Sequence, residues 1–100
     1  MTFIEISVQM LKALKELHDA NLVHRDVKPD SFMIQDDCVK IIGFGSATQY
    51  TRNGEHIKQS NYGFFSSQAF ASISCLEGNN GVRKDDLESL GYSIMYLIDS

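Results

Sequence analysis

The stretch HRDVKPDSFMIQDDCVKIIGFGS, residues 24–46, decides the fold class because a polar loop runs directly into a strand-like pattern. Residues 32–34 and 39–42 are rich in apolar and β-branched side chains, and the acidic turn Gln35-Asp36-Asp37 separates them. Two such runs around a turn predict a small β-hairpin. The loop before this hairpin, from His24 to Ser31, holds the charged side chains that could carry chemistry.

A helix is predicted before the loop, from about Thr2 to Ala20. Polar residues recur every three or four positions, on one narrow stripe: Glu5, Gln9, Lys12, Glu16 and Asp19. Nearly all residues between them are apolar, and a helix with this pattern is typical of the interior of a larger body. Thr2 and Glu5 have capping-box spacing at its start, and Asn21 is expected to end it.

The chain after the hairpin divides into an irregular segment and a second helix. From Gly43 to about Asn80 no periodicity holds, which predicts a long irregular segment. A second helix is expected to begin near Asp85, because Asp85 and Glu88 have the spacing of a capping box. Its apolar face is wide, so we expect both helices to leave apolar surface bare.

Composition excludes several classes of function. The 100 residues carry a formal net charge of -4, and the basic pair Arg83-Lys84 is followed at once by Asp85-Asp86. Nucleic-acid binding needs a basic stripe, so no nucleic-acid partner is expected. The most apolar segment, residues 87–98, is too short and too polar to cross a bilayer, so no membrane partner is expected.

The N-terminus and the cysteines indicate an intracellular protein. No basic region followed by an apolar run opens the chain, so a secretory signal is not expected. Cys38 and Cys75 are far apart and belong to no CxxC or CxxH arrangement, which predicts two reduced thiols. We therefore expect a cytoplasmic or nuclear location.

The loop sequence HRDVKP (residues 24–29) followed by Ser31 resembles the catalytic loop of protein kinases. HRD alone is a weak signal, but HRDxKP between a helix and a hairpin is specific. The runs RKDDLESLGYSIMY (residues 83–96) and FASIS (residues 70–74) are similar to the casein kinase 1 family. The resemblance spans the chain and implies an α+β fold: a mainly helical fragment of the kinase large lobe, with a small hairpin carrying the catalytic-loop and DFG-like positions.

The resemblance assigns the chemistry to Asp26 and Lys28. Phosphoryl transfer needs a carboxylate that orients the attacking hydroxyl and cations that neutralise the phosphates. Asp26 would be that carboxylate and Lys28 would steady the transferred phosphate, in the serine/threonine kinase pattern. The implied cofactors are ATP and magnesium, and the implied partner is a protein substrate or another protein. The alternative interpretation is that Asp26 and Lys28 form a solvated loop pair.

Two positions depart from what magnesium binding requires. In the family, an Asn that ends the catalytic loop and the Asp that opens DFG hold the metal, and the matching residues here are Ser31 and Gly43. A serine hydroxyl is a weak neutral ligand for a hard cation, and glycine offers no side chain. Asp36 and Asp37 lie at the far end of the expected hairpin and cannot replace them. The site is therefore predicted to be catalytically impaired.

Three further residues are expected to support the loop. By resemblance, Asp86 accepts hydrogen bonds from backbone N–H groups of the loop, while His24 and Arg25 hold the loop from within. The alternative for Asp86 is a helix N-terminal acid that interacts only with the helix dipole.

The segment before FASIS also departs from the family. Ser67 could contact Asp26 through its hydroxyl on the substrate side of the loop. Ala69 stands where the family has an arginine that pairs with an anion beside the substrate groove. A preference for acidic or phosphorylated substrates is therefore not expected.

Three interpretations of function remain open. The first, which we prefer, is a casein kinase 1-like homologue with lost phosphotransfer and a binding or scaffold role at most. The second is an active serine/threonine kinase that uses Asp26 and Lys28 with atypical metal binding, and the third is a remnant without function. The glycine-rich loop, the strand lysine and its glutamate partner are not found, so residues 1–100 are expected to form a partial kinase domain. Without the small lobe, weak ATP binding is expected.

Overall fold

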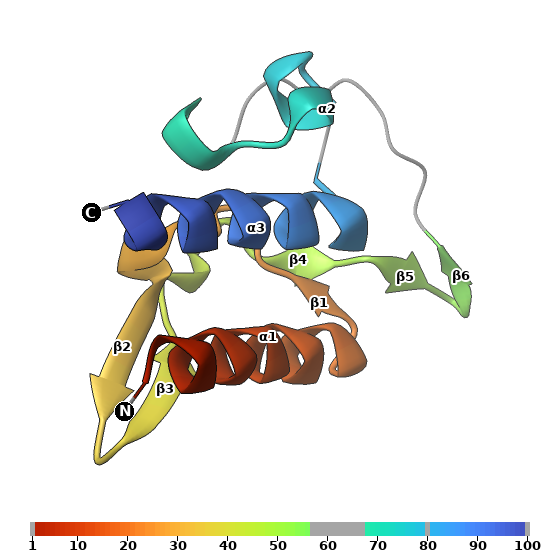
Figure 1. The fold of residues 1–100 in the computed structure, drawn as a ribbon. Helices are drawn as coiled ribbons and strands as arrows, with labels where there is room; N and C mark the ends of the chain where they lie inside the picture. Colours follow the sequence, from red (N-terminus) through yellow and green to blue (C-terminus); the bar gives the residue numbers. More distant parts are fainter. Residues whose placement is uncertain (1, 57–67, 80, 100) are drawn as a thin grey trace.

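Two long helices, α1 (Phe3–Asp19) and α3 (Arg83–Asp99), contact each other and run in opposite directions (Figure 1). The computed structural model describes residues 2–56, 68–79 and 81–99. The elements between the two helices are β1 (Leu22–Val23), η1 (Pro29–Ser31), β2 (Phe32–Gln35), β3 (Cys38–Ile41), η2 (Phe44–Ser46), β4 (Thr48–Gln49), β5 (Thr51–Arg52), β6 (Glu55–His56), η3 (Gln68–Phe70) and α2 (Ile73–Leu76). The hairpin β2–β3 packs against α1, and α2 lies on the other side of α3 (Figure 1).

Helix α1 has the bounds that its sequence pattern predicts. The backbone N–H of Glu5 donates to Thr2 Oγ1 at 3.1 Å, and the Glu5 carboxylate accepts from the backbone N–H of Thr2 at 3.4 Å. This reciprocal capping box satisfies donors that the first helical turn leaves unpaired. The helix ends at Asp19, and Asn21 follows with a positive φ of 68°. Asn tolerates this left-handed conformation better than most residues, so the predicted end is confirmed.

The hairpin β2–β3 is confirmed, one residue earlier in its second strand than expected. The antiparallel register pairs Phe32 with Ile41 and Gln35 with Cys38. The turn residues Asp36 and Asp37 have φ values of 53° and 58°. A two-residue turn with positive φ at both positions matches the twist of the flanking strands, which is why short polar residues occupy it.

The prediction that residues 43–80 are irregular is wrong for much of the part that the structure describes. Strand β4 pairs with β1, with Val23 opposite Thr48, and β5 pairs with β6. The β5–β6 turn is formed by Asn53 and Gly54, whose φ values are 54° and 80°. An Asn-Gly pair is the strongest short-range hairpin signal, so this turn could have been recognised from the sequence.

The second helix is confirmed, and it begins two residues before the predicted start near Asp85. Helix α3 begins at Arg83, and Asp85 accepts a hydrogen bond from the backbone N–H of Val82 at 2.9 Å. Asp85 is therefore the third residue of the helix, and its side chain bonds back to Val82, the residue before the helix. An acid at the third helical position does the same in a capping box. Glu88 instead accepts from the backbone N–H of Ile73 at 2.8 Å.

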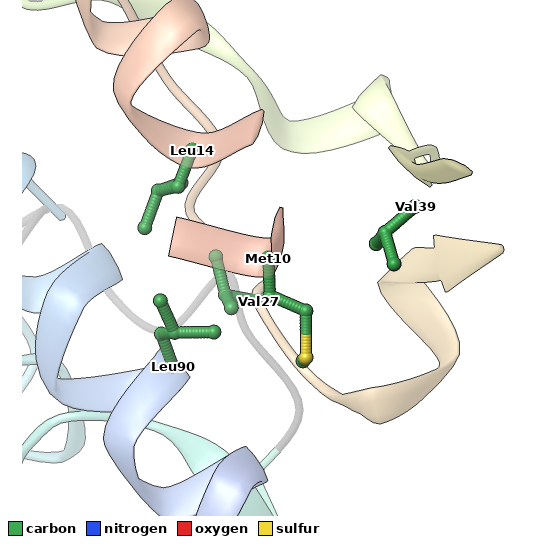
Figure 2. Close-up of a cluster of buried hydrophobic side chains, with 5 residues drawn as sticks. All are labelled: Met10, Leu14, Val27, Val39 and Leu90. Carbon is green, nitrogen blue, oxygen red and sulfur yellow. The ribbon is translucent and has the colours of Figure 1, made fainter. Parts of the chain in front are cut away.

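One hydrophobic core joins the two helices to the loop and the hairpin (Figure 2). It contains Met10 and Leu14 from α1, Val27 from the loop, Val39 from β3 and Leu90 from α3. Leu14 is 0% exposed and Val27 is 3% exposed, so the loop is fastened to the helices by burial of its central side chain. The position of the loop at residues 24–31 therefore depends on how the Val27 side chain packs in the core.

The outer faces of both long helices carry exposed apolar side chains, as expected. The exposed set on α1 and α3 includes Phe3, Ile4, Val8, Leu11, Leu87, Met95, Tyr96 and Ile98. Among the described residues, none of the helices is both long enough and apolar enough to cross a membrane.

Leu14→Ala is expected to destabilise the fold by about 2–5 kcal/mol, because it leaves a cavity in the core that α1, the loop, β3 and α3 share. Leu11→Ala on the same helix is the matched control, because Leu11 is 50% exposed. Its expected effect is within about 0.5 kcal/mol. Urea unfolding followed by circular dichroism measures both, and equal midpoints for the two variants would contradict the placement of the core.

The two cysteines should differ sharply in reactivity. Both are free thiols, Cys38 exposed and Cys75 buried. Burial raises the pKa of the Cys75 thiol. The Ser72 hydrogen bond opposes this effect only in part, and the nearby Asp85 carboxylate raises the pKa further. At pH 8 a thiol-specific reagent should therefore label Cys38 much faster, because the thiolate is the reactive form. Labelling of Cys38→Ser at the wild-type rate would refute this.

Candidate functional site

The loop between β1 and β2 presents a partly exposed ion pair. Asp26 and Lys28 flank the buried Val27, so both side chains point away from the core. Lys28 Nζ lies 3.5 Å from Asp26 Oδ2, and the two side chains are 33% and 26% exposed. The residues expected to carry the chemistry are therefore together, with the carboxylate already paired to the ammonium group.

The buried carboxylate of Asp86 holds the start of this loop. Asp86 is 1% exposed. Its Oδ2 accepts from the backbone N–H of His24 at 2.7 Å, and its Oδ1 accepts from that of Arg25 at 2.9 Å. His18 Nε2, from α1, lies 2.8 Å from Oδ2 and donates to it. Asp86 thus joins α3, α1 and the loop, beyond any interaction with the helix dipole.

Arg25 has an unusual backbone conformation that its hydrogen bonds help to maintain. Its φ is 69°, in the left-handed region that a long side chain rarely adopts. The Asp86 bond holds its backbone, and its Nε donates to the carbonyl of Ser46. A Cβ at Gly81 would approach Arg25 Cγ to 3.1 Å, so the missing side chain of Gly81 makes room for the arginine. Arg25 therefore links the loop to the segments around residues 46 and 81.

Both ring nitrogens of the fully buried His24 are engaged. Its Nε2 lies 2.7 Å from the Ile42 carbonyl, and its Nδ1 lies 3.2 Å from the Asp26 backbone nitrogen. A carbonyl only accepts and a backbone N–H only donates, so the network assigns the neutral tautomer with the proton on Nε2. His24 consequently ties the loop to the end of β3 and is not available as a base.

Ser31 closes the loop onto itself. It is 3% exposed, and its Oγ donates to the Asp26 carbonyl at 2.7 Å and accepts from the Lys28 backbone N–H at 3.2 Å. The hydroxyl has thus used its donor and one acceptor position on the loop backbone. Sequence reasoning treated Ser31 as a degenerate metal position, and the structure shows what else this side chain does.

Gly43 follows the hairpin with a φ of 78° and a ψ of 53°. A Cβ built there would lie 4.0 Å from His24 Nε2, an ordinary van der Waals distance, so there is room for a side chain, but the positive φ strains any L residue at this position. Asp36 and Asp37 lie in the β2–β3 turn, at the other end of the hairpin.

Ser31 and Gly43 therefore do not fit magnesium. Magnesium requires near-octahedral oxygen coordination, with at least one or two carboxylates from the protein. Ser31 offers a buried, bonded hydroxyl and Gly43 offers no side chain. In residues 2–56, 68–79 and 81–99, no three His, Cys, Asp or Glu side chains gather in a way that could hold a metal ion.

Sequence reasoning missed a second buried polar network beside the first. Ser72 Oγ donates to Asp85 Oδ1 at 2.7 Å and accepts from the Cys75 backbone N–H at 3.1 Å. Ser72 is 0% exposed and Asp85 is 4% exposed. No local pattern reveals this contact, because 13 residues separate Ser72 from Asp85. Of the substrate-side residues, Ala69 is exposed and Ser67 lies outside the described residues.

Asp86→Asn should release the loop, because an amide cannot accept all the hydrogen bonds that the carboxylate accepts and leaves buried donors unpaired. We expect a loss of stability of about 3–5 kcal/mol and faster hydrogen exchange at the Arg25 amide. Asp85→Asn is the matched control. It should accelerate exchange at the Val82 amide instead. If both variants affect the same amides, the assignment of separate networks is wrong.

Comparison with known protein families agrees with this geometry. The family model described as Protein kinase domain matches residues 2–100, which include the loop, the hairpin and both long helices. The small α+β fold with short antiparallel strand pairs is consistent with a fragment of the protein kinase lobe. Protein kinases use ATP and magnesium and act on protein substrates. On this match, the chain belongs to the protein kinase family.

Proposed function

We propose that this protein is a casein kinase 1-like serine/threonine kinase homologue whose phosphotransfer is impaired and which acts at most by binding or scaffolding a protein partner. The observation that carries the proposal is that Ser31 and Gly43, which match the family's metal-binding positions, offer no suitable metal ligand. Ser31 is buried and bonded to its own loop, and Gly43 has no side chain.

The size of the expected impairment follows from the electrostatics of phosphoryl transfer. Metal ions bridge the phosphates and neutralise the charge that develops in the transition state. Loss of one preorganised electrostatic group typically lowers the rate by about 10²–10³-fold. Loss of both side-chain ligands should cost at least that much, because the ion itself is held less well.

The casein kinase 1 assignment is supported by how two segments meet. The FASIS segment and the start of α3 are the two runs that resemble this family. Ser72 and Ile73 of the first bond to Asp85 and Glu88 of the second, at 2.7 and 2.8 Å. The rings of Phe70 and Tyr96 also pack edge to face, with centroids 5.5 Å apart. The resemblance thus concerns residues that form one packed unit.

The binding role is supported by a loop that keeps its shape although its metal positions lack suitable ligands. The hydrogen bonds of Asp86, His24 and Ser31 keep the loop shaped without any ligand. A protein surface that is preorganised in this way loses little entropy on binding. The ion pair of Asp26 and Lys28 is the observation that favours the alternative, an active kinase with atypical metal binding.

The decisive test is to restore the metal ligands in the full-length protein. Ser31→Asn combined with Gly43→Asp should raise magnesium-dependent transfer from labelled ATP to a generic protein acceptor by about 10²-fold or more. Position 43 has room for an aspartate side chain, and Asp tolerates the left-handed backbone better than most residues, although the φ of 78° strains any L residue there. Each protein is assayed with and without magnesium.

Asp26→Ala in both backgrounds is the control, because it should abolish the restored transfer. The proposal is wrong if the unmodified protein already shows Asp26-dependent transfer at about 1–100 s⁻¹, the usual range for kinases. A magnesium-dependent rise in the melting temperature of the unmodified protein with ATP would support the active alternative.

A further inference from the structure

A pocket of about 750 Å³ lies between the end of α1 and the start of α3, away from the loop at residues 24–31. Its size falls in the usual range for binding sites, about 300–1,000 Å³. Its walls include apolar and cationic side chains: Leu11, Val82, Leu87, Lys15, Arg83 and Lys84. One acid, Asp19, also lines the pocket, and it is paired with Lys15. In Figure 1 the C-terminus of α1 and the N-terminus of α3 lie at the same end of the molecule.

The fold separates charges that are adjacent in the sequence. Arg83 and Lys84 are exposed, whereas Asp85 and Asp86 are 4% and 1% exposed. Both carboxylates face inward, where they accept hydrogen bonds from backbone N–H groups and from the side chains of Ser72 and His18. Of the four charged residues 83–86, the two that meet solvent are therefore the cations.

The helix dipole is not the source of attraction for an anion here. Asp85 and Asp86 lie in the first turn and already complement the dipole. Attraction must come from the side-chain ammonium and guanidinium groups. Lys15 is paired with Asp19 at 2.7 Å, and this hydrogen bond raises the Lys15 pKa. Arg83 and Lys84 consequently carry most of the positive potential at the pocket.

Arg83 is held in a position to bind an anion. Its guanidinium carbon lies 4.4 Å from the ring centroid of Tyr50, a cation–π distance. Tyr50 is itself fixed, because its hydroxyl donates to the His18 carbonyl at 2.6 Å. Stacking engages the face of the guanidinium group and leaves its edge for carboxylate or phosphate oxygens.

We infer that this pocket binds a protein segment in which acidic groups lie next to an apolar side chain. The acidic groups would meet Arg83 and Lys84, and the apolar side chain would cover Leu11 and Leu87, which are 50% and 46% exposed. The chain as a whole carries a net charge of -4, so an acidic segment is repelled elsewhere and attracted here. The inference rests on the proposed binding function for the class of partner, but not on the loss of phosphotransfer.

The test measures fluorescence anisotropy of a labelled twelve-residue peptide, made of Asp and Glu with one central Leu, added to the complete protein. Lys84→Gln should weaken peptide binding. The double variant Lys84→Gln with Arg83→Gln should weaken it by about tenfold or more. Lys12→Gln is the matched control, because Lys12 is an exposed lysine of α1 outside this pocket. Its affinity should stay within twofold of wild type.

Two further arms separate a peptide site from a simple anion site. A peptide with Ser in place of Leu should bind more weakly, and raising the salt concentration should weaken the Leu peptide further. The inference is overturned if the wild type does not bind, if Lys12→Gln and Lys84→Gln weaken binding equally, or if both peptides bind alike and inorganic phosphate displaces them. Because Arg83→Gln removes the Tyr50 contact, the single Lys84 variant decides the outcome if the double variant loses its circular dichroism spectrum.

Failure here is distinguishable from failure of the proposed function. Magnesium-dependent transfer by the unmodified protein would overturn the impairment and would leave the peptide measurements as they are. Absent peptide binding would overturn the pocket alone, because none of its named wall residues belongs to the loop at residues 24–31.

Discussion

The buried carboxylate of Asp86 is the interaction on which the arrangement of this protein depends. A charge that is 1% exposed is stable only if its hydrogen bonds replace those of water. Its partners are the backbone N–H groups of His24 and Arg25 and the ring of His18. The need to satisfy this one group therefore brings α3, α1 and the loop to the same point, and the shared core then packs around them.

The same organisation shows that the shape of this kinase loop is maintained independently of any bound group. The shape of the loop is maintained by internal hydrogen bonds from Asp86, His24 and Ser31, which require neither metal nor nucleotide. Metal binding instead requires unpaired oxygen ligands that face the phosphates. These two requirements fall on different atoms, so the second can be lost while the first is kept. The Ser31 hydroxyl belongs to the first group of atoms, because it bonds to the loop backbone.

At the start of α3, the fold separates the acidic side chains from the basic ones. The sequence Arg83-Lys84-Asp85-Asp86 is neutral when its charges are summed, yet the helix turns the acids inward and the bases outward. Successive helical residues point in different directions, so adjacent charges need not cancel at the surface. A pocket with cationic and apolar walls results on a protein that is acidic overall.

Local patterns alone determined α1, the β2–β3 hairpin and the family. The capping box of Thr2 and Glu5, the Asp36-Asp37 turn and the HRDxKP loop each act over a few residues, which a single sequence displays. The Asn53-Gly54 turn was equally visible and was overlooked. Only the tertiary structure decided the pairing of β1 with β4, the role of Ser31, the Ser72–Asp85 contact and the direction of the charges on α3. Most of these contacts join residues that are distant along the chain. All of them depend on which polar groups the folded core buries, because a buried polar group needs a hydrogen-bond partner.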